Sequence, residues 1–163
     1  MQYLKYIIIY FILLFAEKNL LSFISIKGIV PDIILIFVII ISLQENKAKS
    51  TVIGFIAGLI QDIFSTYFFG LSALTKSIVG FWGGIFQQPK KKYSLSSYSI
   101  AVAIMVLVHE IIFGIIYNLG THTGFFRLMV QFIIPRTVYT LLFAIITFLL
   151  FKPILWKTER IME

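Results

Sequence analysis

Five charged residues interrupt otherwise apolar stretches of this 163-residue chain: Asp32, Asp62, Lys76, Glu110 and Arg136. A charge at membrane depth costs at least ~3 kcal/mol if it faces lipid, so such residues face protein and pair with one another or mark a substrate path. Two interpretations follow and stay open. The five residues form ion pairs that fix the register of helices, or they form a site that contacts a ligand or a partner.

The sequence lacks the spacing that several catalytic and metal sites require. His109 and Glu110 begin an HExxH-like pattern, but Phe113 stands where the second His is needed, which excludes this zinc motif. The chain has no Cys, no Walker A motif, no GxGxxG and no GxSxG. We therefore expect no catalytic residue, no metal and no cofactor, and rank a membrane enzyme below the other hypotheses.

The composition is that of a membrane protein. Sixty per cent of the residues are apolar, only 13% are charged, and the mean hydropathy is +0.99, whereas soluble domains are about half apolar and about a quarter charged. The net charge of +7 comes largely from basic residues between apolar runs, including PKKK at 89–92. We interpret these as topology signals and lipid contacts, and expect no nucleic-acid partner.

The apolar runs predict one polytopic domain of six transmembrane helices. A helix crosses the bilayer core with about 20 apolar residues, and interfacial aromatic residues can extend the shorter runs. A basic tail at 152–163 is expected to lie on the cytoplasmic face, as a short interfacial helix or as an irregular anchor. The predicted spans are 4–21, 30–43, 52–66, 71–86, 98–117 and 129–151.

The basic residues predict that both termini are cytoplasmic, because Lys and Arg concentrate in cytoplasmic connections. Few of them fall on the outer side in this arrangement: Lys18, Lys27 and Arg127. Most fall on the inner side: Lys5, Lys47, Lys49, Lys90, Lys91, Lys92, Lys152, Lys157 and Arg160.

Glycines recur at helical spacing in the third and fourth spans. Gly54, Gly58 and Asp62 are four residues apart and share one helix face. Gly80 and Gly84 give the fourth span a similar face. Small residues at this spacing let another helix approach closely, so Asp62 is expected to point toward protein.

The charges fall at matching depths in two predicted hairpins. Asp62 and Lys76 flank the turn at Gly70 at similar distances, so we predict that they pair directly or through water. Replacing Asp62 by Leu would then cost roughly 3–5 kcal/mol by leaving Lys76 unpaired. The same argument predicts a pair between Glu110 and Arg136.

Pro31 and Asp32 open the second span. Proline suits the first helical position, and an acidic residue suits the first turn, where the helix dipole favours negative charge. That structural role is sufficient to explain Asp32. All five intramembrane charges nevertheless fall in the outer half of the predicted bundle, around what would be a water-filled depression.

Three stretches resemble the MreD family of rod shape-determining membrane proteins. GIVPDIILIFVIIISL (28–43) resembles the Pro-Asp opening of the family's second helix. GFIAGLIQDIFS (54–65) resembles its Gly-x-x-x-Gly-Leu-x-x-Asp segment, and FGLSALTKSIVGFWGG (69–84) resembles the start of its next helix. The residues that match the family motif are Pro31, Asp32, Gly54, Gly58, Asp62, Gly70 and Leu71.

The resemblance implies a non-enzymatic scaffold of the cell-elongation machinery, which makes peptidoglycan at the bacterial cytoplasmic membrane. MreD-like proteins partner the bitopic protein MreC and belong with MreB, RodA and a class B penicillin-binding protein. Their fold is similar to that of the substrate-binding subunits of energy-coupling-factor transporters. In this interpretation a helix of MreC packs against glycine-lined or aromatic faces.

The alternative is a transporter subunit that binds a small molecule in the outer depression. Asp62 and Glu110 would then contact the ligand, aided by Lys76 or Arg136.

Overall fold

The described part of the chain is almost entirely helical. The computed structural model describes residues 2–20, 23, 25, 26, 28–65, 68–87, 94–121 and 124–155. These residues form helices and one isolated β-bridge between Ile26 and Ile29. The elements in chain order are α1 (Gln2–Phe15), η1 (Ala16–Leu20), α2 (Ile33–Ser42), α3 (Lys47–Ile63), α4 (Leu71–Ile85), α5 (Leu95–Thr121), α6 (Phe125–Leu128), η3 (Met129–Ile133) and α7 (Ile134–Leu155).

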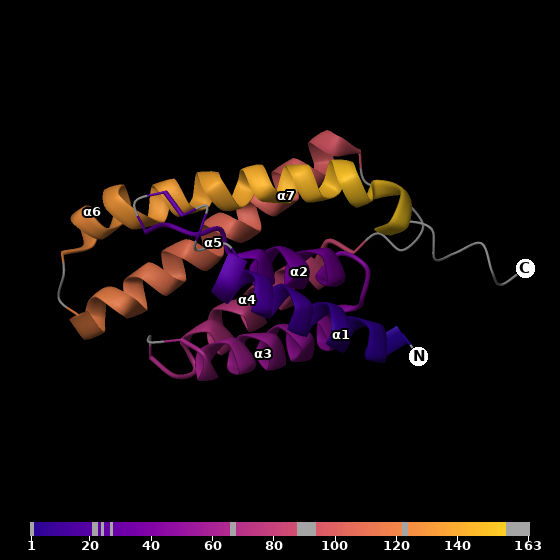
Figure 1. Ribbon diagram of the computed structural model, residues 1–163, viewed down its shortest axis with the longest axis horizontal. Coiled ribbons are helices and arrows are strands. Elements are labelled where there is room, and N and C mark those ends of the chain that lie inside the picture. The colour runs from indigo at the N-terminus through magenta and orange to yellow at the C-terminus, as the bar shows by residue number, and fades with distance from the viewer. Residues whose placement is uncertain are drawn as a thin grey trace, which may run out of the picture.

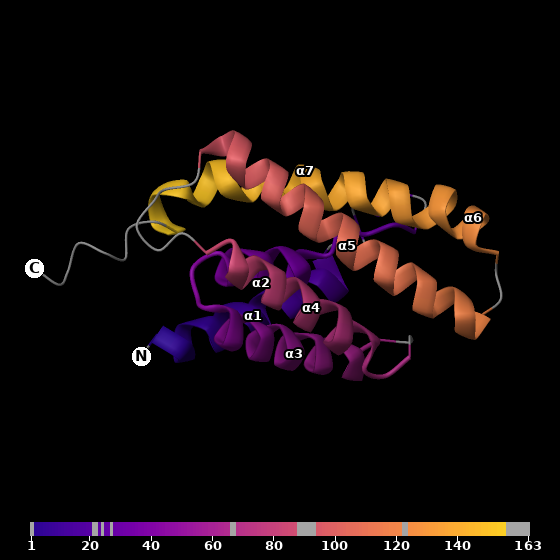
Figure 2. The same ribbon diagram turned by 180° about the vertical axis from the view of Figure 1, so that it is seen from behind.

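Helix α2 is the centre of the bundle. Its sequence, IILIFVIIIS, is apolar on every side, as expected of a helix that is buried all round. It contacts α1, α3, α4, α5 and α7, and Figures 1 and 2 show it between the α5–α7 side and the α1–α3 side. Leu35 and Ile39 belong to the main core together with Tyr98 and Phe148, whose rings stack 4.3 Å apart.

Helix α2 is short, so it occupies only part of the length of the bundle. Ten helical residues span about 15 Å, whereas the 27 residues of α5 span about 40 Å. Gln87 fixes the segment that directly follows α2, because its side chain donates a hydrogen bond to the Gln44 carbonyl oxygen at 2.7 Å. The N-terminal end of α2 therefore lies inside the bundle, and helix does not fill the space beyond it.

Helices α3 and α4 form a hairpin whose backbones touch. A Cβ added at Gly54 or Gly58 would collide with α4 backbone atoms, and one added at Gly80 or Gly84 would collide with the α3 backbone. The predicted small-residue faces therefore pack against each other within one hairpin. The turn between them requires a left-handed residue at Gly70, where φ is +92°.

Two long helices pack beside this hairpin. Helix α5 is one, and α6, η3 and α7 together form the other without interruption. The π-helical turn η3 directly precedes Pro135, whose ring lacks a backbone N–H, so the wider turn accommodates a break in the α-helical hydrogen-bond series. Ser96–Gly120 and Phe126–Leu150 are long and apolar enough to cross a membrane.

Helix α1 packs against the hairpin through Tyr10, whose hydroxyl donates to the Ala57 carbonyl oxygen at 2.7 Å. The start of α1 and the end of α7 lie at the same end of the bundle (Figure 1). The opposite end holds the end of α3, the end of α5 and the start of α6 (Figure 1).

The helices cover the six ranges expected from sequence, with shifted ends. Helix α3 begins at Lys47 rather than 52 and ends at Ile63 rather than 66, and α2 begins at Ile33 rather than 30. Helix α7 continues to Leu155, past the expected start of the tail at 152. The remainder of the predicted tail, 156–163, lies outside the described residues.

Candidate functional site

Asp32 caps the N-terminus of α2 in the middle of the bundle. One carboxylate oxygen accepts a hydrogen bond from the Leu35 backbone N–H at 2.7 Å, and the Asp32 backbone N–H donates to Thr140 Oγ1 at 3.2 Å. The residue is 1% exposed. The sequence placed Pro31 and Asp32 in the first turn of this helix. In the structure α2 begins at Ile33, so Asp32 is the N-cap residue and Pro31 lies before the helix.

Two cationic side chains lie close to the second carboxylate oxygen of Asp32, Oδ2. Lys76 Nζ lies 2.8 Å from Oδ2, and Arg136 Nη2 lies 3.4 Å from the same atom. Lys76 is 1% exposed, so this pair is enclosed by protein. A buried lysine needs such a partner because burying an isolated charge costs several kcal/mol. The predicted Asp62–Lys76 pair is therefore wrong, since Lys76 reaches α2 and not α3.

Asp62 instead caps α4 from the neighbouring helix. Its Oδ2 accepts hydrogen bonds from the backbone N–H groups of Gly70 at 2.9 Å and Ala73 at 3.1 Å, and its Oδ1 accepts one from Ser72 at 3.2 Å. The N-cap residue Gly70 has no side chain to do this. Because α3 ends at Ile63, Asp62 lies beside the start of α4, more than one helical turn before Lys76.

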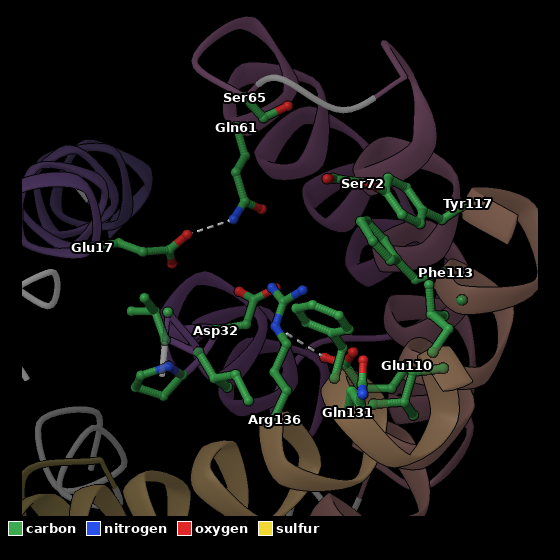
Figure 3. A pocket seen from close by; sticks show the side chains of 18 of the residues that line it. Glu17, Asp32, Gln61, Ser65, Ser72, Glu110, Phe113, Tyr117, Gln131 and Arg136 are labelled. Carbon is green, nitrogen blue, oxygen red and sulfur yellow. Dashed lines mark hydrogen bonds and ion pairs between the residues drawn. The ribbon is translucent and has the colours of Figure 1, made fainter. Parts of the chain in front are cut away.

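Glu110 and Arg136 face each other, as the depth argument expects. Arg136 Nε lies 3.5 Å from Glu110 Oε1 (Figure 3). The guanidinium also lies over the Phe113 ring, 5.6 Å from its centroid. His109 is fully buried, and its Nδ1 lies 3.4 Å from Glu110 Oε1. Arg136 thus links Glu110 on α5 to Asp32 on α2.

Glu17 joins the site from η1. Its Oε2 accepts a hydrogen bond from the Ile34 backbone N–H at 3.2 Å, and its Oε1 accepts one from Gln61 Nε2 at 2.7 Å. Glu17 therefore contacts the first turn of α2 beside Asp32. Neutral donors alone hold this carboxylate, because none of the described basic side chains lies within ion-pair distance of it.

These residues line a cavity of about 720 Å³ beyond the N-terminus of α2. Figure 3 shows Glu17, Gln61 and Ser65 toward the upper left of it, and Ser72 toward the upper right beside Phe113 and Tyr117. The Asp32–Arg136–Glu110 network lies below them in this view, with Gln131 beside it. Apolar and aromatic side chains complete the walls, among them Phe113, Tyr117, Leu128, Phe132 and Ile133.

Four of the five charged residues named from the sequence meet at this site, and the fifth, Asp62, faces α4 instead. Asp32, Glu110 and Arg136 line the cavity, and Lys76 lies behind Asp32. The sequence reasoning missed Glu17, which was taken for an interruption at the end of the first span. The rule that flags charges within apolar runs would have found Glu17 as well, because apolar residues both precede and follow Glu17-Lys18-Asn19.

The comparisons with known proteins decide the family. The family model described as rod shape-determining protein MreD matches residues 1–157. The chain belongs to the MreD family. Neither a curated protein nor a solved structure matches the chain at a significant level. Membership in a family of membrane proteins agrees with the two helices able to cross a bilayer, and it implies a role in the determination of rod shape.

The site of this MreD-family chain is arranged for binding or for internal support. The acidic and histidine side chains within the described ranges form no group of three that could hold a metal ion. Asp32 and Glu110 form ion pairs with Lys76 and Arg136, whereas the part of the cavity near Glu17 is lined by oxygen atoms that accept hydrogen bonds. The two sides of one cavity therefore differ in what they can bind.

Proposed function

We propose that this chain is a non-enzymatic, multi-pass scaffold of the cell-elongation complex in the bacterial cytoplasmic membrane. The observation that carries the proposal is the match to the MreD family over residues 1–157, which covers nearly the whole chain. An MreC-like bitopic protein is the direct partner. MreB, RodA and a class B penicillin-binding protein are indirect partners in peptidoglycan synthesis.

The proposed topology has six crossings and both termini in the cytoplasm. The helices over the six expected ranges support it, as does the location of the start of α1 and the end of α7 at one end of the bundle (Figure 2). The proposal includes a likeness to the substrate-binding subunits of energy-coupling-factor transporters. A short central helix below a polar cavity is compatible with that likeness.

The partner's transmembrane helix must use a face other than the glycine-lined one, because α3 and α4 cover each other's glycines. Exposed aromatic side chains remain on other faces. Phe11 on α1 is 51% exposed, and Trp82 on α4 is 48% exposed. Both are large enough to anchor a helix, and neither belongs to the buried core. They are therefore two of the exposed aromatic side chains that could contact the MreC-like protein.

Copurification from host membranes in a mild detergent tests the scaffold. A tagged chain is expected to retain the MreC-like protein, and depletion of the chain is expected to turn rod-shaped cells round. Phe11→Ala and Trp82→Ala serve as matched variants, since each removes one half-exposed ring from a different face. Loss of the partner in one variant and not in the other would locate the contact. A wild-type chain that retains no MreC-like protein contradicts the proposal.

A second candidate function is a carrier subunit for a small molecule, and the 720 Å³ cavity with its polar lining favours it. Ligand-dependent stabilisation of the purified chain, together with normal rod shape after depletion, would favour the carrier over the scaffold.

A further inference from the structure

One side of the cavity consists of hydrogen-bond acceptors. Glu17 keeps lone pairs beyond the two that accept from Ile34 and Gln61, since an ionised carboxylate has about four acceptor positions. Ser65 and Ser72 also line the cavity, and Ser65 Oγ donates to the Asp62 carbonyl oxygen at 3.1 Å. The Ser72 hydroxyl has no hydrogen-bond partner among the described residues.

Gln61 presents a buried acceptor that nothing in the described structure satisfies. The residue is 6% exposed, and its Oε1 has no hydrogen-bond partner in that part of the chain. The amide cannot turn around, because Oε1 would then face the Glu17 carboxylate in place of Nε2. The carbonyl is therefore held away from Glu17, on the cavity side (Figure 3). A buried acceptor without a donor costs free energy, so such an atom calls for an explanation.

The formal charges favour the same kind of ligand as the hydrogen-bond acceptors do, namely a cation. Asp32 and Glu110 are balanced by Lys76 and Arg136, which are their ion-pair partners. Glu17 adds one further carboxylate, which has no ion-pair partner among the described residues. What this side of the cavity lacks is a group with both N–H donors and a positive charge.

We propose that the cavity binds a primary ammonium group, with Glu17 and the Gln61 carbonyl as its acceptors. An ammonium has three donors and no acceptor, which suits a surface made of a carboxylate, an amide oxygen and serine hydroxyls. The apolar walls at Phe113, Leu128 and Phe132 suit the hydrocarbon part of the ligand.

The rim of the cavity adds a second constraint. Lys18 and Arg127 line it and are exposed. These cations suit a negatively charged group on the same ligand. Two sources supply the primary ammonium group, namely the ethanolamine headgroup of a phospholipid and a free small amine, and only the phospholipid also brings a negatively charged phosphate for these cations. The inference concerns the cavity alone and does not depend on the scaffold role.

Thermal unfolding of the purified full chain in a neutral detergent tests this. The probes are dihexanoyl phosphatidylethanolamine, dihexanoyl phosphatidylcholine, free ethanolamine and free choline. Choline carries the same charge as ethanolamine but has no N–H donor, which makes it the matched control. A saturable rise in Tm is expected with an ethanolamine probe, because a ligand that binds only the folded state stabilises it by mass action.

Two variants complete the test. In Glu17→Gln the new amide can donate to Gln61 and accept from Ile34, so Gln61 turns its own NH₂ toward the cavity. This removes the charge and reverses the hydrogen-bond polarity, and we expect at least tenfold weaker binding with an unchanged Tm of the unliganded protein. Glu45→Gln, which removes a carboxylate paired with Lys49 outside the cavity, should bind as the wild type does.

The pattern of responses identifies the source. A response to the phospholipid alone identifies a lipid headgroup, and a response to free ethanolamine alone identifies a small amine. A response to both supports the ammonium chemistry itself. No rise with either ethanolamine probe, an equal rise with the choline probes, or an undiminished rise in Glu17→Gln overturns the proposal.

Discussion

The carboxylates inside the bundle fall into two groups that differ in the groups that bind them. Asp32 and Glu110, on the α5–α7 side, are met by the cations of Lys76 and Arg136. Asp62 and Glu17, on the hairpin side, are met by neutral N–H groups. Asp32, Asp62 and Glu17 accept hydrogen bonds, as a charge inside a protein requires, whereas Glu110 Oε1 meets Arg136 only at ion-pair distance. The first group fixes helices through charge, whereas the second caps helix ends.

The difference follows from where each carboxylate lies relative to a helix terminus. Asp62 ends α3 beside the start of α4, where N–H groups have no partners within the helix. Glu110 lies in the interior of α5, where the neighbouring backbone is already hydrogen-bonded, so its partner must be a side chain, and here that partner is Arg136. Asp32 does both, since it caps α2 and binds Lys76.

The largest effect is expected at Asp32. Asn at this position still accepts a hydrogen bond from Leu35 but leaves the buried Lys76 charge without its counter-ion. We expect Asp32→Asn to lower the free energy of unfolding by about 3–5 kcal/mol, measured by denaturant titration in detergent micelles.

A double variant checks the cause of that loss. Asp32→Asn combined with Lys76→Met removes both charges and should recover much of the stability. If the double variant is as unstable as Asp32→Asn alone, the ion pair is not what Asp32 contributes.

The next effect concerns the close contact on which the Asp62 cap depends. A methyl group at Gly58 would meet the Ser72 carbonyl and the Ala73 backbone, so α3 and α4 must move apart. We expect Gly58→Ala to cost about 1–3 kcal/mol in the same titration, with a lower protein level in membranes. Ile56→Leu, at a half-exposed position of α3, is the matched control and should be neutral. Equal stability of the two variants would show that the hairpin tolerates a wider spacing.

The sequence predicted the helices and the depth of the charged residues along them better than it predicted which residues those charges contact. Uniform apolarity and glycine spacing correctly indicated a helical bundle with close helix contacts, but not that Gly54 and Gly80 would face each other's helices. Depth along a hairpin placed Asp62 and Lys76 near one turn, yet it says nothing about direction around the helix axis. Lys76 points toward α2, a helix of distant sequence, and that relation depends on packing of the whole bundle.

The cavity was expected only in outline. Its existence depends on α2 being about 15 Å long and on η1 reaching its first turn through Glu17. Neither property is visible in the apolar pattern, because the run 30–43 reads as one span and Glu17 reads as the end of another. Of the five residues expected around a depression, Asp32, Glu110 and Arg136 line the cavity, whereas Asp62 and Lys76 do not, and Glu17 was not expected there.

A smaller effect is expected at Asp62. Since this carboxylate caps a helix and does not pair with Lys76, Asp62→Ala should cost about 1–2 kcal/mol rather than the 3–5 kcal/mol inferred for an unpaired lysine. Asp62→Asn should cost less than Asp62→Ala, because Asn is as good a cap as Asp. A loss as large as that of Asp32→Asn would mean that the charge of Asp62, and not its capping bonds, is what matters.

The smallest effect on stability is expected at Glu17, and it separates the two groups most directly. Both Glu17 and Asp32 accept an N–H of the first turn of α2, but no described cation depends on Glu17. Glu17→Gln keeps its two hydrogen bonds once the Gln61 amide turns, so we expect a change within about 0.5 kcal/mol in the denaturant titration. Asp32→Asn is its matched comparison, because it makes the same carboxylate-to-amide change at the acceptor of the next N–H of α2. Equal losses in the two variants would mean that the Glu17 carboxylate also supports a buried charge, and the distinction between a closed and an open side of the cavity would then fail.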